Sequence, residues 1–344
     1  MPSQIENIFS KIHDRLILFR YILPFIKKNE KRVISPQNTL CLFCQPRGGS
    51  TWLAEIFLHI SNSILIDEPL WRGKVNVPFK KPDHYTRKVP KISDLDFFFN
   101  QYIPEDVDWP EARMAFEDIL SGRVISIGLY NEGGLKKLKN GNYYITKFCY
   151  ANLLLPWLID RFDFNAILLT RHPCAVVASQ LKYPVWRDIN IEEFRKIDDF
   201  RFNQIYYSAL EKVGKIDSKE KYLALQWALG FKHTAMNPRN NKRWLTISYE
   251  GLLNNYSHEI ERISNRFSFD LDNLNIDSST PSKSTQPTSL KYMEEGQQLS
   301  SWKKELTGKQ ISTIFNVLEK FDIDIYTKEV EPEYERLYSN EKIL

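Results

Sequence analysis

The sequence predicts an α/β protein with a central parallel β-sheet that helices cover on both faces. Short apolar runs with the length of buried strands recur along the chain, and each is joined to a segment with the three- and four-residue spacing of an amphipathic helix. Parallel strands need long crossover connections, which are usually helices, so this alternation favours a parallel sheet. The expected strands are residues 39–44, 63–66, 143–147, 165–170 and 244–248.

The expected helices lie between these strands. Their apolar residues fall at helical spacing over residues 52–60, 153–162, 175–181 and 219–234. The first strand, a glycine-containing turn, the first helix and the strand at 63–66 together have the length and order of one βαβ unit over residues 39–68. We therefore expect these two strands to belong to one sheet.

The rest of the chain divides into three parts around this pattern. Residues 1–35 predict an N-terminal helical extension, 36–325 the main domain, and 326–344 a C-terminal tail. The extension is interpreted as an amphipathic helix packed on the core, with an interfacial membrane helix as the alternative because Lys27, Lys28, Lys31 and Arg32 follow it.

Composition limits the classes of function. The chain has 344 residues, 42% hydrophobic and 26% charged, which is ordinary for a globular protein. A net charge of +4 is too small and dispersed to indicate nucleic-acid binding. The apolar run at 16–26 is interrupted and too short to span a bilayer. Four cysteines without framework spacing predict a cytoplasmic protein, and the Cys41–Cys44 pair has no partners that would complete a metal site.

Polar residues follow the predicted strands where each one ends. Because the carboxyl ends of parallel strands lie along one edge of the sheet, where ligands bind, these residues should meet there. They are Arg47, Gly48, Gly49, Ser50, Thr51, Asp67, Glu68, Lys147, Arg171, His172, Tyr249 and Glu250.

Two of these segments are suited to binding anions. The turn at residues 47–51 leads into a helix, so its backbone N–H groups and the Arg47 side chain would face an anion. Ser50 and Thr51 would either donate to that anion or cap the helix. Arg171 and Ser179 would grip a second phosphate, or they are a surface arginine and a solvent-facing serine.

The combination resembles the family of sulfotransferases that use PAPS (3′-phosphoadenosine 5′-phosphosulfate). Residues 46–53 read Pro-Arg-Gly-Gly-Ser-Thr-Trp-Leu, which is similar to the family's 5′-phosphosulfate loop, and residues 171–179 are similar to its 3′-phosphate segment. Glu-Pro-Leu-Trp at 68–71 resembles a motif of carbohydrate sulfotransferases. Tyr249-Glu250-Gly251-Leu252 and Ser301-Trp302-Lys303 resemble further segments of the family.

The resemblance implies a fold like that of P-loop nucleotide-binding proteins, PAPS as the donor, adenosine 3′,5′-bisphosphate as the product, and no metal. It assigns Arg47 and residues 48–51 to the phosphosulfate, and Arg171 with Ser179 to the 3′-phosphate. It places Trp52 and Tyr249 beside the adenine, where packing in the core is the alternative role. Trp302 and Lys303 would contact the nucleotide from a C-terminal loop.

Catalysis is assigned to Glu68, Arg47 and Lys147. Glu68 would accept the acceptor's proton as general base, or it is a structural carboxylate. Lys147 would neutralise the sulfuryl or leaving oxygen, or it extends from the sheet edge into solvent. The expected acceptor is a hydroxyl or amine of a small molecule or carbohydrate. Its cleft is expected to be walled by residues 71–141, which form a loop-rich insertion, and by residues 182–218.

The sequence departs from the family's pattern in two places. Gly48 stands where a serine is usual, and the glycine-rich form of the C-terminal loop is absent, which puts the contacts of Trp302 and Lys303 in question. A kinase or ATPase of the P-loop type is the rival enzyme, although Gly49 stands where its lysine belongs. A non-catalytic nucleotide-binding protein is the other alternative.

Overall fold

The computed structural model of the chain describes residues 16, 18–70, 100–123, 137–187, 200–269 and 297–339. Its centre is a five-stranded sheet with the order β2-β3-β1-β4-β5, in which every neighbouring pair is parallel. The strands are β1 (Thr39–Cys44), β2 (Ser63–Asp67), β3 (Tyr143–Phe148), β4 (Asn165–Thr170) and β5 (Leu245–Ser248). The predicted fold class, a parallel sheet flanked by helices, is confirmed.

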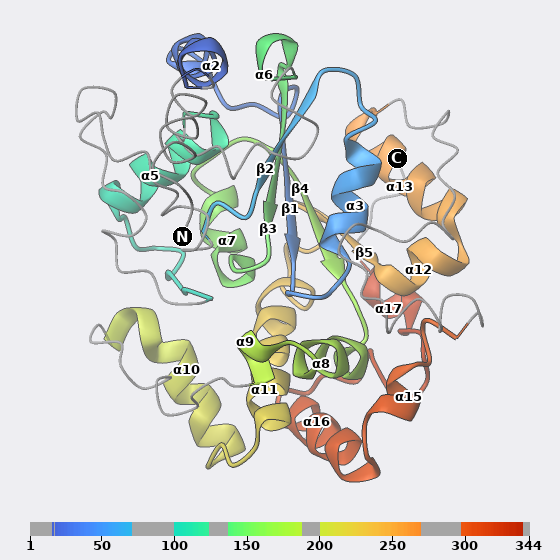
Figure 1. The fold of residues 1–344 in the computed structure, drawn as a ribbon. Helices are drawn as coiled ribbons and strands as arrows, with labels where there is room; N and C mark the ends of the chain where they lie inside the picture. The colour runs from blue at the N-terminus through green and yellow to red at the C-terminus, as the bar shows by residue number, and fades with distance from the viewer. Residues whose placement is uncertain are drawn as a thin grey trace, which may run out of the picture.

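Helices cover both faces of this sheet (Figure 1). One face packs against α3 (Ser50–Phe57), α12 (Tyr249–Asn254) and α13 (Tyr256–Phe267). The other packs against α5 (Pro110–Leu120) and α7 (Leu155–Ile159), and the same hydrophobic cluster extends to α8 (Pro173–Leu181) and α11 (Lys219–Thr234), which lie beyond the carboxyl ends of the strands (Figure 1). The remaining helical elements are η1 (Leu18–Ile22), α2 (Leu23–Asn29), α6 (Lys137–Asn140), η4 (Asn152–Leu154), α9 (Pro184–Arg187), α10 (Phe200–Val213), α15 (Trp302–Glu305), α16 (Gly308–Lys320) and α17 (Tyr334–Leu337).

The expected strand pattern agrees with the observed one to within a residue at each end. β1 and β4 have the predicted bounds, β2 and β3 are one residue longer, and β5 begins one residue later, where Trp244 forms an isolated bridge with Asn240. Each strand is buried along almost its whole length, as expected for a sheet covered on both faces.

The two strands of the expected βαβ unit over residues 39–68 are not neighbours in the sheet. β3 lies between β1 and β2 and pairs with both, so that Lys147 is in register with Leu42 on one side and Asp67 on the other. Length and order cannot distinguish adjacent strands from strands one position apart. The consequence for the site is that Lys147 stands between the turn after β1 and the carboxylates after β2.

The helical part of the N-terminal segment ends before the predicted residue 35. Of the expected helix over residues 1–35, the structure describes η1 and α2, and the helix ends at Asn29, while residues 1–15 and 17 lie outside the described residues. Asn29 is buried, donates to the Gly122 carbonyl at 3.2 Å and accepts from the Tyr144 hydroxyl at 2.5 Å. α2 is therefore docked on the domain. Among the described residues, no helix is long and apolar enough to cross a membrane.

The predicted insertion contains a helix that sequence reasoning missed. α5 begins with Pro110 in its first turn and buries an apolar side that includes Ala112, Phe116 and Ile119. Residues 71–99 and 124–136 of the insertion, and the predicted polar loop at 277–289, lie outside the described residues. The segment expected as a tail from residue 326 packs against the domain, with Tyr326 and Leu337 buried in the same cluster as α8 and α11.

Candidate active site

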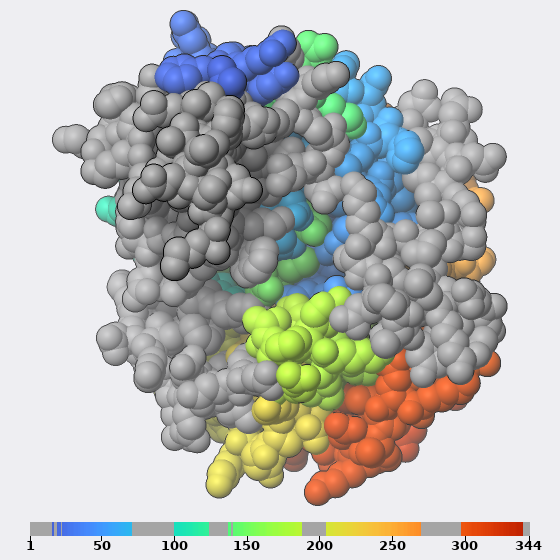
Figure 2. Space-filling model, viewed as in Figure 1, coloured from blue at the N-terminus to red at the C-terminus, as the bar shows by residue number. Residues whose placement is uncertain are grey.

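The carboxyl ends of the strands point toward α8 in Figure 1, and the surface is hollowed just above α8 and α9 in Figure 2. The turn after β1 lies at this edge and is held from two sides. Gln180 Nε2, on α8, donates to the Pro46 carbonyl at 3.0 Å, and Arg171 Nη1 donates to the Arg47 carbonyl at 3.2 Å. The turn itself is closed by the Gly48 amide, which donates to the Gln45 carbonyl at 2.9 Å.

Both glycines of the turn are required by their surroundings. A Cβ on Gly48 would lie 2.4 Å from Cys44 Sγ and 2.9 Å from the Gln45 carbonyl oxygen. Gly49 has φ of 104°, and a Cβ there would lie 2.4 Å from the Tyr249 ring. The turn is thus packed against protein, and it leads directly into α3, whose first backbone N–H groups have no partner within the helix.

The structure brings the two predicted arginines together. Arg47 Nε donates to Ser179 Oγ at 3.2 Å, and its guanidinium lies 4.3 Å from the centre of the Tyr183 ring. The Arg171 guanidinium lies 4.2 Å from the centre of the Tyr249 ring. Burial is the main cause that lowers the pKa of Arg47, with the nearby Arg171 adding to it. Two cations therefore lie at one partly buried edge, an arrangement that would suit an anionic ligand.

Two residues of the site have a backbone conformation that their side chains disfavour. Arg47 has φ of 71° and Glu68 has φ of 52°. The other non-glycine residues with positive φ in the described part of the chain are Asn, Asp or Ser, whose short polar side chains make the left-handed backbone conformation less costly. Such strain costs on the order of 1–3 kcal/mol per residue and gathers at functional sites.

Lys147 joins the ends of β2 and β3 to the turn. Its Nζ lies 2.6 Å from Asp67 Oδ1, 3.6 Å from Glu68 Oε1 and 3.4 Å from Thr51 Oγ1. Glu68 Oε2 accepts the Cys149 N–H at 2.9 Å, while its Oε1 is buried without a hydrogen bond among the described residues. The three charged side chains are at most 12% exposed. Lys147 therefore does not extend into solvent, and Glu68 Oε1 has no hydrogen bond among the described residues but is ion-paired with Lys147.

The predicted Ser50, Trp52 and Tyr249 line the inner side of the turn. The Ser50 hydroxyl is 3.1 Å from Cys149 Sγ, so in this structure it is not the cap of α3, which has no side-chain cap. Trp52 meets Tyr249 edge to face with ring centres 5.7 Å apart, and its Nε1 has no hydrogen bond in the described part of the chain. The Tyr249 hydroxyl accepts from Gln298 Nε2.

Trp302 and Lys303 do not share the position of the other predicted residues. Trp302 is 1% exposed and stacks on His172, with ring centres 4.5 Å apart and planes 12° apart. Its indole is part of the core, while Lys303 is exposed and lies 5.4 Å above the Trp302 ring. The doubt that the missing glycine-rich loop raised for this segment is consistent with that placement.

His172 has a structural role at the start of α8. Its Nδ1 accepts the Cys174 N–H at 3.2 Å, capping the helix, and its Nε2 lies 2.9 Å from the Thr327 carbonyl. The backbone N–H of His172 donates to Glu250 Oε1 at 2.8 Å. Burial lowers the pKa of His172 to about 4, so the ring is neutral near pH 7.

Sequence reasoning missed three contributors to the site. Tyr183 lies two residues beyond the end of α8, where nothing in the pattern marks an aromatic residue as a platform for Arg47. Gln180 follows Ser179 directly and holds the turn through the Pro46 carbonyl. Asp67 was placed at the strand edge, but its pairing with Lys147 depends on the position of β3 in the sheet.

In comparisons with known proteins, no family model and no curated protein matches the sequence. Among solved structures, the sulfotransferase domain of the Synechococcus PCC 7002 olefin synthase is 16% identical, with a TM-score of 0.42 over 86% of this chain and 98% of that chain. The sulfotransferase domain of the curacin biosynthetic pathway is 16% identical, with a TM-score of 0.41 over 87% of this chain and 100% of that one.

Mouse sulfotransferase SULT7A1, complexed with PAP, is 11% identical, with a TM-score of 0.36 over 86% of this chain and 88% of that chain. These structural neighbours are sulfotransferases, the family that the motifs of the sequence resemble. A likeness at this level assigns no substrate or activity to the chain.

Proposed function

We propose that this protein is a PAPS-dependent sulfotransferase that transfers a sulfuryl group to a hydroxyl or amine of a small-molecule or carbohydrate acceptor. The observation that carries the proposal is that Arg47, Arg171 and Ser179 lie together at one edge of the sheet. They lie beside a glycine-containing turn that leads into α3. Because its four cysteines are free thiols, we further propose that the protein acts in a reducing, cytoplasmic setting.

The residues present suit this donor. The turn leads directly into α3, whose first backbone N–H groups have no partner within the helix and are suited to bind a phosphate. Arg171 Nε is buried without a hydrogen bond in the described residues, which leaves a charged donor for a second anionic group. Arg47 and the turn would hold the phosphosulfate, Arg171 and Ser179 the 3′-phosphate, and Trp52 with Tyr249 the adenine.

When bound, PAPS supplies a sulfuryl group on a phosphate leaving oxygen. Arg47 and the amides of the turn would stabilise the charge that gathers on that oxygen as its bond to sulfur breaks. Lys147, held by Asp67 at 2.6 Å, would neutralise the sulfuryl oxygens. Glu68 would take the proton of the acceptor on Oε1 as the new bond to sulfur forms, since Oε2 is committed to the Cys149 N–H.

Ligand binding and transfer test this proposal together. Adenosine 3′,5′-bisphosphate should raise the melting temperature of the protein in a saturable way, and Mg·ATP should not. Radiolabelled PAPS should then pass its label to members of a panel of hydroxyl and amine acceptors. Stabilisation by Mg·ATP alone would instead support the kinase or ATPase alternative. If the protein binds the bisphosphate but neither transfers the label to any acceptor nor hydrolyses PAPS, the result would support the non-catalytic alternative.

The Glu68→Gln variant tests the assigned base. Loss of the general base should lower turnover about 100-fold, while the dissociation constant of adenosine 3′,5′-bisphosphate stays within about twofold, because Gln keeps the hydrogen bond from Cys149. Glu319→Gln, an exposed change on α16, is the matched control. Equal losses of turnover and of nucleotide affinity would contradict the role of Glu68 as base.

A further inference from the structure

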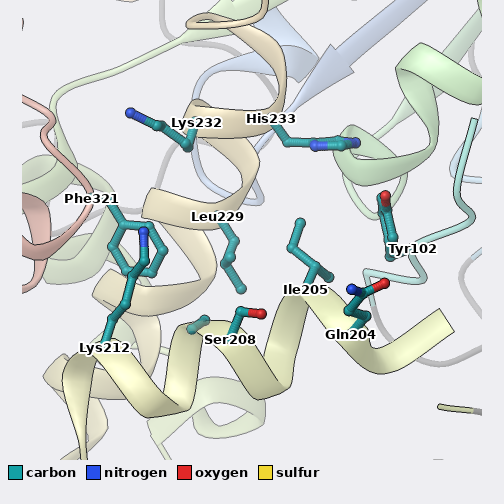
Figure 3. Close-up of a pocket in the computed structure, with 10 residues that line it drawn as sticks. Tyr102, Gln204, Ile205, Ser208, Lys212, Leu229, Lys232, His233 and Phe321 are labelled. Carbon is teal, nitrogen blue, oxygen red and sulfur yellow. The ribbon is translucent and has the colours of Figure 1, made fainter. Parts of the chain in front are cut away.

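A second pocket lies away from the strand edge, between α10 and α11 (Figure 3). Its volume is about 430 Å³, within the range of small-molecule sites. Its floor is apolar, with Ile205 and Ala209 from α10 facing Leu229 from α11. A site of this kind accepts the apolar body of a ligand and leaves its orientation to the groups at the two ends.

One end of the pocket is positively charged. Lys212 and Lys232 both lie at the Phe321 end of the pocket in Figure 3, and Lys212 Nζ is 5.5 Å from the centre of the Phe321 ring, while the amine of Lys232 points away from Lys212. The acidic group nearest to Lys232 is Asp322 at 4.0 Å, and that side chain is 85% exposed. Lys212 has no acidic partner within 4.0 Å among the described residues. Two weakly neutralised cations at one end favour an anionic group there.

The opposite end is uncharged and aromatic. Tyr102 and His233 meet there edge to face, with ring centres 5.1 Å apart. Burial lowers the pKa of His233 to about 4, so this ring carries no charge near pH 7. Gln204 and Ser208 add neutral polar groups along the α10 side. The charge of the pocket is therefore confined to the lysine end.

This pocket is distinct from the candidate active site. The residues of α11 that approach Gln45, at the turn after β1, are Gln226 and Gly230: Gln45 Nε2 donates to the Gln226 carbonyl, and a Cβ on Gly230 would lie 2.2 Å from the same nitrogen. The lining of the pocket includes neither of these residues, nor Arg47, Arg171 or any other residue placed in the candidate active site. A ligand in the pocket would thus not contact Arg47 or Arg171.

We infer that the pocket between α10 and α11 binds a small amphipathic carboxylate, with its anionic group between Lys212 and Lys232 and its apolar body over Leu229 and Ile205. The chemistry follows from the asymmetry of the lining: charge at one end, apolar side chains along the floor, and neutral aromatic groups at the other end. Tyr102 and the α10 residues of the pocket fall in segments expected to wall the acceptor cleft, but the inference uses none of the residues proposed to bind PAPS or to catalyse the transfer, so it can be tested separately from that activity.

Calorimetric titration with octanoate and octanol, a pair that differs in charge but has the same chain, tests the inference on the full-length protein. Octanoate should bind saturably and about tenfold more tightly than octanol. The double variant Lys212→Gln with Lys232→Gln should lose about tenfold in octanoate affinity and keep its octanol affinity within about twofold, since glutamine retains part of the apolar stem without the charge.

A second variant tests the location without removing a charge. Ser208→Trp changes an exposed lining position on α10 and should block both probes, whereas Lys309→Gln, an exposed change on α16, should affect neither. An excess of adenosine 3′,5′-bisphosphate should leave octanoate affinity unchanged. Absence of saturable octanoate binding, equal affinity for octanol, or full octanoate binding by Ser208→Trp protein of unchanged melting temperature would overturn the inference.

Discussion

Gly48 stands where the family that the sequence resembles usually has a serine, and the Cys44 side chain beside it explains this difference. The buried Cys44 side chain occupies the volume that a side chain at position 48 would need, with a Cβ placed 2.4 Å from its sulfur. Cys44 and Gly48 thus form a complementary pair, and the hydroxyl that a serine would offer is exchanged for tighter packing beneath the turn. Neither residue alone explains the other from sequence, because their contact depends on how the turn folds back on β1.

This pairing predicts that Gly48→Ser is less harmful together with Cys44→Ala than alone. The single change should destabilise the protein by about 1–3 kcal/mol through overpacking. Cys44→Ala in the same chain should recover the part of that loss that comes from the Cys44 contact, while the close approach to the Gln45 carbonyl remains. The measurement is urea unfolding of the wild type, both single variants and the double variant. Purely additive losses would show that the two side chains do not compete for the same space.

At the scale of the element, the sequence was informative about what each strand and helix is and where it ends, but not about how the strands are ordered. The apolar runs identified β1 and β4 with correct bounds because burial on both faces leaves a continuous apolar pattern. The place of β3 between β1 and β2 is a long-range pairing, with no local signal. The Lys147–Asp67 ion pair, which depends on that pairing, therefore appeared only in the structure.

Connections between elements carry part of the site for the same reason. Tyr183, in the short link from α8 to α9, supports the Arg47 guanidinium with its ring at 4.3 Å. α8 also supplies Ser179 and Gln180 to the turn after β1. This one helix and its link thus position the predicted phosphosulfate arginine, although only Ser179 was identifiable from the sequence.

Removing the ring of Tyr183 should weaken binding of adenosine 3′,5′-bisphosphate. Tyr183→Leu deletes the cation–π contact and frees Arg47, so we expect the dissociation constant to rise about three- to tenfold. Tyr183→Phe keeps the ring and should stay closer to wild type, which makes it the matched control. The measurement is calorimetric titration of the nucleotide. If Phe and Leu weaken binding equally, the ring is not the platform for Arg47.

At the scale of the whole molecule, the C-terminal segments support the strand edge from behind. Trp302 stacks on His172, and the Tyr326 hydroxyl donates to Glu250 Oε2 at 3.2 Å, so residues far along the chain fix the start of α8 and of α12. Sequence reasoning placed Trp302 at the nucleotide by resemblance. Its burial could not be foreseen, since it results from packing among α15, α8 and the chain after α16.

Three buried groups make the stability of the fold depend on pH in opposing directions. Burial lowers the pKa values of His172 and His233 to about 4, and burial raises the pKa of Glu250 to about 7. Each neutral histidine contributes stability that is present above its unfolded pKa near 6.5 and is lost as the pH falls toward 4. Protonated Glu250 contributes stability that is present below its unfolded pKa near 4.5 and is lost as the pH rises through 7.

Glu250→Gln should therefore make the protein more sensitive to acid. As the pH falls from 7 to 5, each of the two histidines lowers the stability of the fold by on the order of 2 kcal/mol. Protonation of Glu250 raises the stability by about the same amount, which offsets the loss from one histidine. The introduced glutamine amide accepts the His172 N–H but cannot titrate, so the variant should lose about 2 kcal/mol more than the wild type over this interval. Urea unfolding of both proteins at the two pH values measures the difference, and equal losses would mean that Glu250 is ionised throughout this range in the folded protein.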